Sequence, residues 1–408
     1  MKNEKSGISS YTRWICEAIK DTCKKHGGRP GGSHGTKSAM LDMMREGAAY
    51  SDTAELYPFT MHPEAFIGSI SLGAFFDVMG VNFFILFLIY PYPVLSFLSA
   101  LLFFISVSVV FFEFFLYLPF TDRFYPERKS HNLLLTRRAE GMSRRKIILV
   151  GHCDSAYELP FINRRPRALF ITLITGAALG KALGLLFGTL SIFFTPTGTV
   201  AVALGAVECA LLVFFVPFLF FVNWDCVTDG ANDNLTGCFL GLSILKEMND
   251  GGERLSNTDL CCLITDGEES GLRGAFAFAK DKAREFREAN TVVIAVDTIH
   301  DPKELMIYDR GINFTQKNGE VAKNLLKTAG RSLGIDIPLS PFYPGATDAE
   351  AFSRAGVEAS AICAVSHEPC DYYHTESDTH TNLCEGGIEL VRRILISAIK
   401  IYDSGYDG

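Results

Sequence analysis

Five short polar clusters in the sequence combine imidazole and carboxylate side chains, the groups that hold divalent metal ions in proteins. In chain order they contain His152 and Asp154 in GHCDS, Asp233 in GANDN, Glu268 and Glu269 in TDGEES, Asp297 in VIAVDT, and His374 in YYHTESDT. Such ligands suit zinc or a similar ion, and two metal ions about 4 Å apart need a carboxylate that bridges them. The residue types therefore predict metal-assisted hydrolysis.

Each cluster also has a structural interpretation when it is taken alone. A single histidine such as His152 is usually a packed structural residue, and an acid before a helix, such as Asp233, usually caps that helix. His374 competes with His367 and His380 in the same loop, and spacing does not choose among the three. The occurrence of all five clusters within one alternating pattern of strands and helices is what favours a metal hydrolase.

The elements that must position the clusters alternate between strands and helices. Runs typical of strands lie at 53–61, 132–138, 146–151, 259–265, 291–296 and 359–365. Helical spacing occurs at 10–26, 36–47, 235–248, 271–288, 318–333 and 386–403. This alternation predicts an α/β fold with a mixed, mainly parallel sheet and helices on both faces, whose strand ends carry the clusters.

Two stretches almost free of charge interrupt that pattern. Residues 65–120 contain only Asp77 and Glu113 as charges, and residues 168–224 contain only Lys181 and Glu208. Proline-containing turns divide each stretch into two segments of 26 or 27 residues, whereas a helix needs about 20 apolar residues to cross a membrane. We therefore expect two transmembrane hairpins rather than buried core helices, which seldom lack a polar face.

The hairpins divide the polar sequence into three parts of one interrupted domain. We expect this domain at 1–64, 121–167 and 225–408, with the hairpins at 65–120 and 168–224. No internal repeat or low-complexity segment suggests a further domain.

The basic residues predict the orientation in the membrane. Residues 121–167 contain eleven Lys and Arg, and both hairpin tips contain none. Because cytoplasmic loops are rich in basic residues, we expect an integral membrane protein with four transmembrane helices, whose α/β domain and both termini are cytoplasmic. Glycosylation sequons at Asn234 and Asn313 would favour the opposite side, but such matches are common by chance. The N-terminal residues do not resemble a secretory signal.

The charged residues inside the hairpins are expected to pair, because charges within a membrane are costly alone. Asp77 and Lys181 both lie 13 residues from the outer ends of their helices, a depth of about 20 Å at a rise of 1.5 Å per residue. We therefore expect Asp77 to pair with Lys181. Glu208 is shallower, at nine residues from its tip, and is a second candidate partner for Lys181. A polar path or a dimer contact is the functional alternative.

The composition argues against several other classes of protein. Hydrophobic residues make up 48% of the 408 residues, which is apolar for a protein that meets only water. The net charge of −8 provides no cationic field for nucleic acid. The eleven cysteines have no regular spacing and no C-x-x-C motif, so we expect reduced thiols. Cys153, between two candidate site residues, is expected to pack rather than to act as a nucleophile.

The clusters also resemble a known family. The series GHCDS, GANDNLTG, TDGEESGLRGA, VDT and HTESDT resembles the motifs of the cocatalytic zinc aminopeptidases, metallopeptidase family 28 of clan MH. GGRPGGS at 27–33 resembles that family's N-terminal GPRxxGS turn. The resemblance covers residues 10–62, 132–160 and 226–403, but not the hairpins. It implies a zinc exopeptidase fold of the phosphorylase/hydrolase-like type, here in a membrane-embedded variant.

The resemblance implies two zinc ions, although other divalent metals are possible. It places His152 and Asp297 on one ion, Glu269 and His374 on the other, and Asp233 between them as the bridging ligand.

The resemblance also implies the remaining catalytic roles. Glu268 matches the family's general base, and Asp154 matches the carboxylate that orients the first histidine. Asp348, in GATDAEAFSRAG, is expected to provide structural support only. The implied substrate is a peptide with a free amino terminus, and the implied reaction is removal of N-terminal residues.

Two alternatives remain open within the same fold. One is a glutaminyl-cyclase-like acyltransferase with a single zinc ion, although Tyr373 stands where such cyclases carry tryptophan, which favours the peptidase. The other is a catalytically silent membrane scaffold, which the presence of all five ligand positions and Glu268 disfavours. A transporter is disfavoured because the hairpins show neither broken helices nor inverted repeats. The sequence does not indicate the oligomeric state.

Overall fold

The chain folds into two compact units, each of which is described by itself. The computed structural model describes residues 7–160, 166–311, 316–341, 345–366, 370 and 372–408. The first unit, here called the α/β unit, comprises Met1–Pro63, Glu127–Glu158 and Asp225–Gly408. The second, here called the helical unit, comprises Glu64–Pro126 and Leu159–Trp224.

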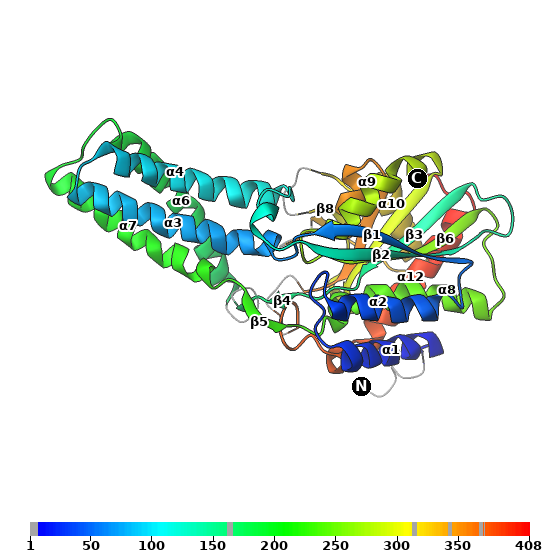
Figure 1. Cartoon of the computed structure of the whole chain (residues 1–408). Coiled ribbons are helices and arrows are strands. Elements are labelled where there is room, and N and C mark those ends of the chain that lie inside the picture. Colours follow the sequence, from blue (N-terminus) through cyan, green and yellow to red (C-terminus); the bar gives the residue numbers. More distant parts are fainter. Residues whose placement is uncertain (1–6, 161–165, 312–315, 342–344, 367–369, 371) are drawn as a thin grey trace. The chain divides into compact units, whose positions relative to one another are not determined.

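A mixed sheet of eight strands runs through the α/β unit in the order β1-β2-β6-β3-β7-β10-β8-β9 (Figure 1). The central strands β6, β3, β7 and β10 are parallel to one another, while β2 pairs antiparallel with β1 and β6, and β8 pairs antiparallel with β10. The strands are β1 (Thr53–Met61), β2 (Arg128–Arg137), β3 (Arg145–His152), β6 (Thr258–Thr265), β7 (Thr291–Ile299), β8 (Leu305–Arg310), β9 (Leu339–Pro341) and β10 (Glu358–Ala364). Two short strands, β4 (Tyr157–Glu158) and β5 (Asn223–Val227), form a separate pair.

Helices cover both faces of the sheet (Figure 1). The helices of the first face are α1 (Ser10–His26), α2 (His34–Gly47), α8 (Thr236–Asp250), α10 (Glu320–Ser332) and α12 (Glu385–Asp403). The helices of the second face are α9 (Arg273–Glu288) and α11 (Asp348–Arg354). Along β3, Ile147 and Leu149 pack on the first face, while Ile148 and Val150 pack on the second. Successive strand residues point to opposite faces, so a sheet covered on both sides needs the continuous apolar run that predicted this strand. The predicted fold class is confirmed.

Three elements of the eight-stranded sheet and its covering helices had no detectable signal in the sequence. Helix α11 has seven residues, too few for a helical period to emerge. Strand β9 has three residues, and two of them are exposed. Strand β8 pairs antiparallel with β10. Its six residues contain no apolar alternation long enough to identify it as a strand. The expected alternation therefore omits one edge of the sheet.

The helical unit contains four helices that are long and apolar enough to cross a membrane: Ala65–Ile89, Pro93–Phe115, Arg167–Ser191 and Gly198–Leu219. They correspond to α3 (Ala65–Ile89), α4 (Pro93–Val109) with its π-helical continuation η1 (Val110–Phe115), α6 (Arg167–Ser191) and α7 (Gly198–Leu219). A short helical turn, η2 (Asp122–Phe124), follows η1 in the chain. The expected hairpin limits, 65–120 and 168–224, enclose these helices except for Arg167.

Small and hydroxylated residues let these helices approach closely. A Cβ atom on Gly184 would lie 2.3 Å from the Phe103 ring. Ser96 donates a hydrogen bond to the Gly188 carbonyl (2.6 Å), and Ser99 donates one to the Gly80 carbonyl (2.8 Å). Small residues and hydroxyl groups at helix crossings are typical of membrane helix bundles, where lipid provides no hydrophobic driving force between helices.

The charges inside the helical unit differ in their contacts. Lys181 forms an ion pair with Asp77, and its Nζ also lies 2.5 Å from the Ser106 hydroxyl. Glu113 accepts hydrogen bonds from the backbone amides of Phe120 and Thr121 (2.7 Å each). Glu208 is fully buried, and neither of its oxygens has a hydrogen-bond partner among the described residues. Glu208 therefore does not share Lys181 with Asp77.

Candidate metal centre

Three of the polar clusters meet at the carboxyl ends of neighbouring parallel strands. His152 is the last residue of β3, Asp297 lies two residues before the end of β7, and Glu268 and Glu269 follow β6. These strands adjoin in the order β6, β3, β7. Open α/β sheets bind ligands at this edge because the strand ends and their loops converge there.

The other two candidate ligands come from loops. Asp233 lies in the irregular turn η3 (Ala231–Leu235) that precedes α8, and His374 lies between β10 and α12. Asp378 connects the two loops, since its carboxylate accepts hydrogen bonds from the backbone amides of Asn232 (2.7 Å) and Asp233 (3.1 Å). His374 has a φ angle of +53°, and Tyr373 stacks on its ring with 4.1 Å between centroids. A non-glycine residue in the left-handed region is uncommon and occurs often at functional sites.

Asp233 lies between the two imidazoles. Its Oδ1 is 3.1 Å from His152 Nε2, and its Oδ2 is 3.1 Å from His374 Nε2. His152 Nε2 also lies 3.8 Å from Asp297 Oδ1, and His374 Nε2 lies 3.4 Å from Glu269 Oε1. The carboxylate of Asp233 thus belongs to two groups of potential ligands, one around each histidine.

The potential ligand atoms are close enough to share metal ions. Within each group they all lie within 4.8 Å of one another, and the groups are His152 with Asp233 and Asp297, Asp233 with Glu269 and His374, and His152 with Glu268 and Glu269. The first two groups contain the same residues that the family resemblance assigns to two separate ions. His380 belongs to none of these groups, and His367 lies outside the described residues.

The chemistry of this cluster fits a divalent cation. His152 Nε2 and Glu269 Oε1 are buried without a hydrogen-bond partner among the described residues, and buried polar atoms are costly unless they are satisfied. Burial, together with the charges of Asp297 and Glu269, raises the pKa of Glu268 well above its usual value. Burial lowers the pKa of His374, but Glu269 and Asp233 outweigh it and raise this pKa to about 10. Protons would therefore be retained here in the absence of a cation, and a bound metal would replace them.

Asp154 holds the glutamate loop with its side chain. Its carboxylate oxygens accept hydrogen bonds from the backbone amides of Glu268 (3.2 Å) and Glu269 (3.1 Å). The backbone carbonyl of Asp154 is 3.0 Å from His152 Nδ1, whereas its carboxylate is 3.6 Å from the same atom. The carbonyl is the nearer contact of His152 Nδ1, and the carboxylate faces both the histidine and the loop of the candidate base, so the orienting role that the resemblance assigns to Asp154 stays a prediction.

Arg29 is a supporting residue to which we assigned no role from the sequence. It is fully buried and donates hydrogen bonds to the backbone carbonyls of Cys153 (2.9 Å), Gly27 (2.7 Å) and Asp229 (2.8 Å). These bonds join the turn at 27–33 to the segments that carry His152 and Asp233. The GGRPGGS motif was the available signal, but its contacts depend on residues more than 100 positions away.

The remaining candidate residues are structural. Burial raises the pKa of the Cys153 thiol to about 12, so the thiol is protonated and packs in the core as expected. Asp348 accepts a hydrogen bond from the Thr265 hydroxyl (2.5 Å). The side chain of Asn234 is buried and donates to the Val296 carbonyl (2.8 Å), so its sequon is not accessible in the folded chain. Asn313 lies outside the described residues.

The sheet order and the acidic cluster with two imidazoles at its strand ends define an α/β protein with a metal-hydrolase site. Residues 217–399 match the family model described as Peptidase family M28. The C-terminal part of the chain is therefore similar to this peptidase family. No curated protein matches the chain significantly in sequence.

Solved structures share the fold at low sequence identity. The aminopeptidase from Aneurinibacillus sp. strain AM-1 is 14% identical, with a TM-score of 0.55 over 96% of this chain and 95% of that chain. BSAP, a zinc aminopeptidase from Bacillus subtilis, is 10% identical, with the same TM-score and coverage. The Fimbriiglobus ruber glutaminyl cyclase is 12% identical, again with a TM-score of 0.55 and coverage of 96% and 95%. Aminopeptidases and cyclases therefore share this architecture, and the likeness is one of fold.

Proposed function

We propose that the protein is a membrane-anchored aminopeptidase with two zinc ions. The observation that supports this proposal is the position of Asp233, whose two carboxylate oxygens each face the Nε2 atom of a different histidine at 3.1 Å. His152 and Asp297 would complete one ion's ligand set, and Glu269 and His374 the other's. A carboxylate shared between two such sets is what a pair of closely spaced metal ions requires.

Glu268 is the proposed general base. Its Oε2 lies 3.8 Å from His152 Nε2, and the hydrogen bonds to Asp154 hold its loop at the cluster. Zinc ions held there would polarise the scissile carbonyl and lower the pKa of the attacking water. Glu268 accepts the proton of that water and returns it to the nitrogen of the leaving amine. No serine or cysteine nucleophile is needed, in agreement with the buried, protonated thiol of Cys153.

The substrate of this proposed activity is a peptide with a free amino terminus. Carboxylates outnumber basic side chains in the cluster, since Asp154, Asp233, Asp297, Glu268 and Glu269 meet only two imidazoles. Two divalent ions would leave these five carboxylates with one negative charge in excess, which favours the positive charge of a terminal ammonium group. An acidic cluster of this kind suits an exopeptidase that removes N-terminal residues.

The proposed location is an integral membrane protein whose α/β unit is cytoplasmic. Support comes from the four apolar helices and from the eleven Lys and Arg of residues 121–167, against none at the hairpin tips. A Thr197→Cys variant in sealed vesicles should react with a membrane-impermeant maleimide from the outer side, above the background of the unsubstituted chain. Labelling from the cytoplasmic side alone would reverse the proposed topology.

Mass spectrometry of defined peptides with free amino termini, incubated with the full chain in detergent, tests the activity. We expect stepwise loss of N-terminal residues that a chelator abolishes and zinc restores. Glu268→Gln should abolish it while zinc remains bound, whereas Glu288→Gln, an exposed glutamate on α9, should leave it unchanged. Intact peptides in the presence of two bound zinc ions would refute the aminopeptidase.

A glutaminyl cyclase is the second candidate, because a solved cyclase shares the fold. Peptides that begin with glutamine separate the two activities within the same experiment. A cyclase releases ammonia and leaves the residue count unchanged, whereas an aminopeptidase shortens the chain. A protein that does neither and binds no zinc would be a silent scaffold.

A further inference from the structure

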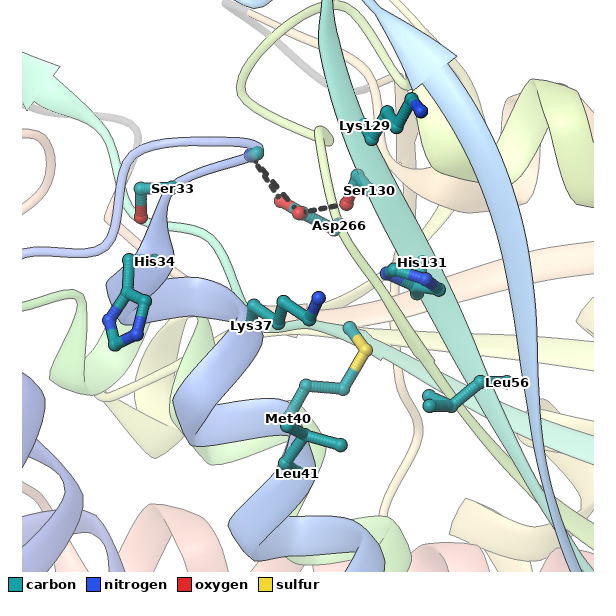
Figure 2. Close-up of a pocket in the computed structure, with 11 residues that line it drawn as sticks. Ser33, His34, Lys37, Met40, Leu41, Leu56, Lys129, Ser130, His131 and Asp266 are labelled. Carbon is teal, nitrogen blue, oxygen red and sulfur yellow. Dashed lines mark hydrogen bonds between the residues drawn. The ribbon is translucent and has the colours of Figure 1, made fainter.

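A cavity of about 200 Å³ lies in the α/β unit, between helix α2 and strands β1 and β2 (Figure 2). The turn Gly32 and Ser33 and the carboxylate of Asp266 form part of its wall. Its apolar lining consists of Met40, Leu41 and Leu56. The volume equals that of about seven water molecules at about 30 Å³ each, which suits a ligand the size of one amino acid rather than an oligopeptide.

Four basic side chains from two elements line this cavity. His34 and Lys37 are one helical turn apart on α2, and Lys129 and His131 are two residues apart on β2. Both spacings place the members of a pair on the same face of their element. Figure 2 shows Lys37 extending from α2 toward His131. Burial and the charge of Lys37 lower the pKa of His131, so His131 is neutral near pH 7 and can donate a hydrogen bond from its ring, while Lys37 carries the positive charge.

The two lysines, Lys37 and Lys129, have no acidic partner among the described residues. Neither lysine forms an ion pair or hydrogen bond there, and Asp266 is the only acid that lines the cavity. The carboxylate of Asp266 already accepts hydrogen bonds from the Gly32 amide (3.1 Å) and the Ser130 hydroxyl. The cavity therefore combines two solvent-exposed lysines that lack an acidic partner among the described residues with an apolar lining, and its electrostatic complement is a small anion that carries an apolar group.

We propose that this cavity binds an amino acid, or the end of a short peptide, through its carboxylate, with an apolar side chain against Met40, Leu41 and Leu56. The identity of this ligand class rests on the proposed function, because an aminopeptidase releases free amino acids and shortened peptides that carry such carboxylates. The binding site itself depends only on the geometry of the cavity. Lys37 and His131 hold the carboxylate, and removal of Lys37 removes most of the affinity.

Asp266 makes the cavity contiguous with the catalytic loop. It is two residues before Glu268, and the turn that covers it contacts the same loop, since a Cβ atom on Gly31 would lie 2.8 Å from the Ser270 hydroxyl. A ligand in the cavity would therefore contact Asp266, at the start of the segment that carries Glu268 and Glu269. The site is distinct from the metal centre, because none of its lining residues belongs to the potential metal ligands.

Titration of the full chain in detergent with N-acetyl-leucine, followed by calorimetry and saturation-transfer NMR, tests the proposal. The acetyl group blocks the amine, so the probe lacks the free amino terminus that the metal centre would accept. We expect saturable binding, with at least tenfold weaker binding of N-acetyl-leucinamide, which differs in lacking the negative charge. Lys37→Met should weaken N-acetyl-leucine binding at least tenfold, and Lys280→Met, an exposed lysine on α9, should not change it.

Other outcomes would overturn the proposal. They are the absence of N-acetyl-leucine binding, equal binding of the amide, or unchanged binding in Lys37→Met. Inorganic phosphate that binds in a Lys37-dependent manner while N-acetyl-leucine does not would identify a phosphate site instead. His131→Gln is a second variant, expected to weaken binding as well, in case Lys37→Met alters folding. Measurement in Glu268→Gln keeps the result independent of hydrolysis, so a failure here and a failure of the proposed function are distinguishable.

Discussion

Lys181 and Asp77 in the helical unit neutralise each other, whereas the acids of the candidate metal centre in the α/β unit outnumber their basic neighbours. Lys181 also donates a hydrogen bond to the Ser106 hydroxyl (2.5 Å), while Asp77 Oδ1 has no hydrogen-bond partner among the described residues. In the α/β unit, atoms of His152 and Glu269 are buried without a hydrogen-bond partner among the described residues. A buried charge that faces an opposite charge is neutralised within the chain, whereas a surplus of buried acids needs protons or a cation.

The two tryptophans allow the units to be followed separately. Trp14 packs edge-to-face on Phe239 in the α/β unit. Trp224, in β5, is the last residue of the helical unit and lines a pocket with Gly68 and Leu72 of α3. They are the only two tryptophans in the chain. Trp224→Phe therefore leaves a fluorescence reporter for the α/β unit, and Trp14→Phe leaves one for the helical unit.

Zinc removal is expected to have the largest effect, and only on the α/β unit. A ligand that binds only the folded state at a concentration one thousand times its Kd stabilises that state by about 4 kcal/mol. Chelation should therefore abolish hydrolysis and lower the temperature of the Trp14 transition, while the Trp224 transition stays in place. Equal shifts of both transitions would show that the ligand requirement is not confined to the acidic cluster.

Loss of one partner of the intramembrane pair should be nearly as large, and should appear in the helical unit. Asp77→Ala leaves Lys181 buried without its counter-charge, which costs about 3–5 kcal/mol. The double variant Asp77→Ala with Lys181→Met should be less destabilised than the sum of the single variants, as measured by the Trp224 transition. Simple additivity would mean that the two residues do not interact.

Arg29 shows a third way to bury a charge, through backbone carbonyls alone. Arg29→Met removes hydrogen bonds from a charged donor to Cys153, Gly27 and Asp229, and such bonds contribute about 1.5–3 kcal/mol each. We expect a destabilisation of at least about 3 kcal/mol. Because the lost bonds hold the segments of two proposed ligands, we also expect weaker zinc binding by equilibrium dialysis. Arg284→Met, an exposed arginine on α9, is the control. Unchanged zinc affinity would limit Arg29 to a structural role.

Glu389 is an acid of the α/β unit that is paired with a basic side chain, that of Arg392. It accepts hydrogen bonds from Thr12 (2.6 Å), Ser9 (2.8 Å) and Arg392 (3.0 Å). Burial raises its pKa, but the hydrogen bonds from Arg392, Thr12 and Ser9 outweigh burial, so the pKa of Glu389 is lowered in the folded state.

The stabilisation from Glu389 is therefore present above the unfolded pKa of about 4.3 and is lost as the pH falls through the lower folded value. Glu389→Gln should destabilise the α/β unit by about 1 kcal/mol at pH 7. The difference from the parent chain in urea unfolding should shrink toward zero below about pH 4. A difference that stays constant with pH would indicate a loss of packing rather than of charge.

The smallest effect is expected for Glu208, the exception in the helical unit. It is buried and has no hydrogen-bond partner among the described residues, so in the membrane it should carry a proton rather than a charge. Glu208→Gln then replaces one neutral polar group with another of similar size, and the Trp224 transition should change by less than about 0.5 kcal/mol. A loss of several times that amount would reveal an ionised carboxylate with an additional ligand.

Local patterns in the sequence account for most of the elements and for the candidate ligands. A strand buried on both faces must be continuously apolar, as in KIILVG at 146–151, and a membrane-crossing helix must be long and almost uncharged. The order of the polar clusters at strand ends was also visible without the structure. Elements of three to seven residues, such as β9 and α11, escaped because they are shorter than the period that reveals them.

Contacts between distant segments could not be read in this way. The choice of His374 over His380 depends on which of the two comes within reach of Asp233, 141 positions earlier in the chain (374 minus 233). The hydrogen bonds from Glu268 and Glu269 to Asp154 span more than 110 residues. Composition and periodicity record only what a segment needs from solvent and from its immediate neighbours. The partners of a buried polar group are set by how the sheet brings remote loops together, and so they emerged only from the folded chain.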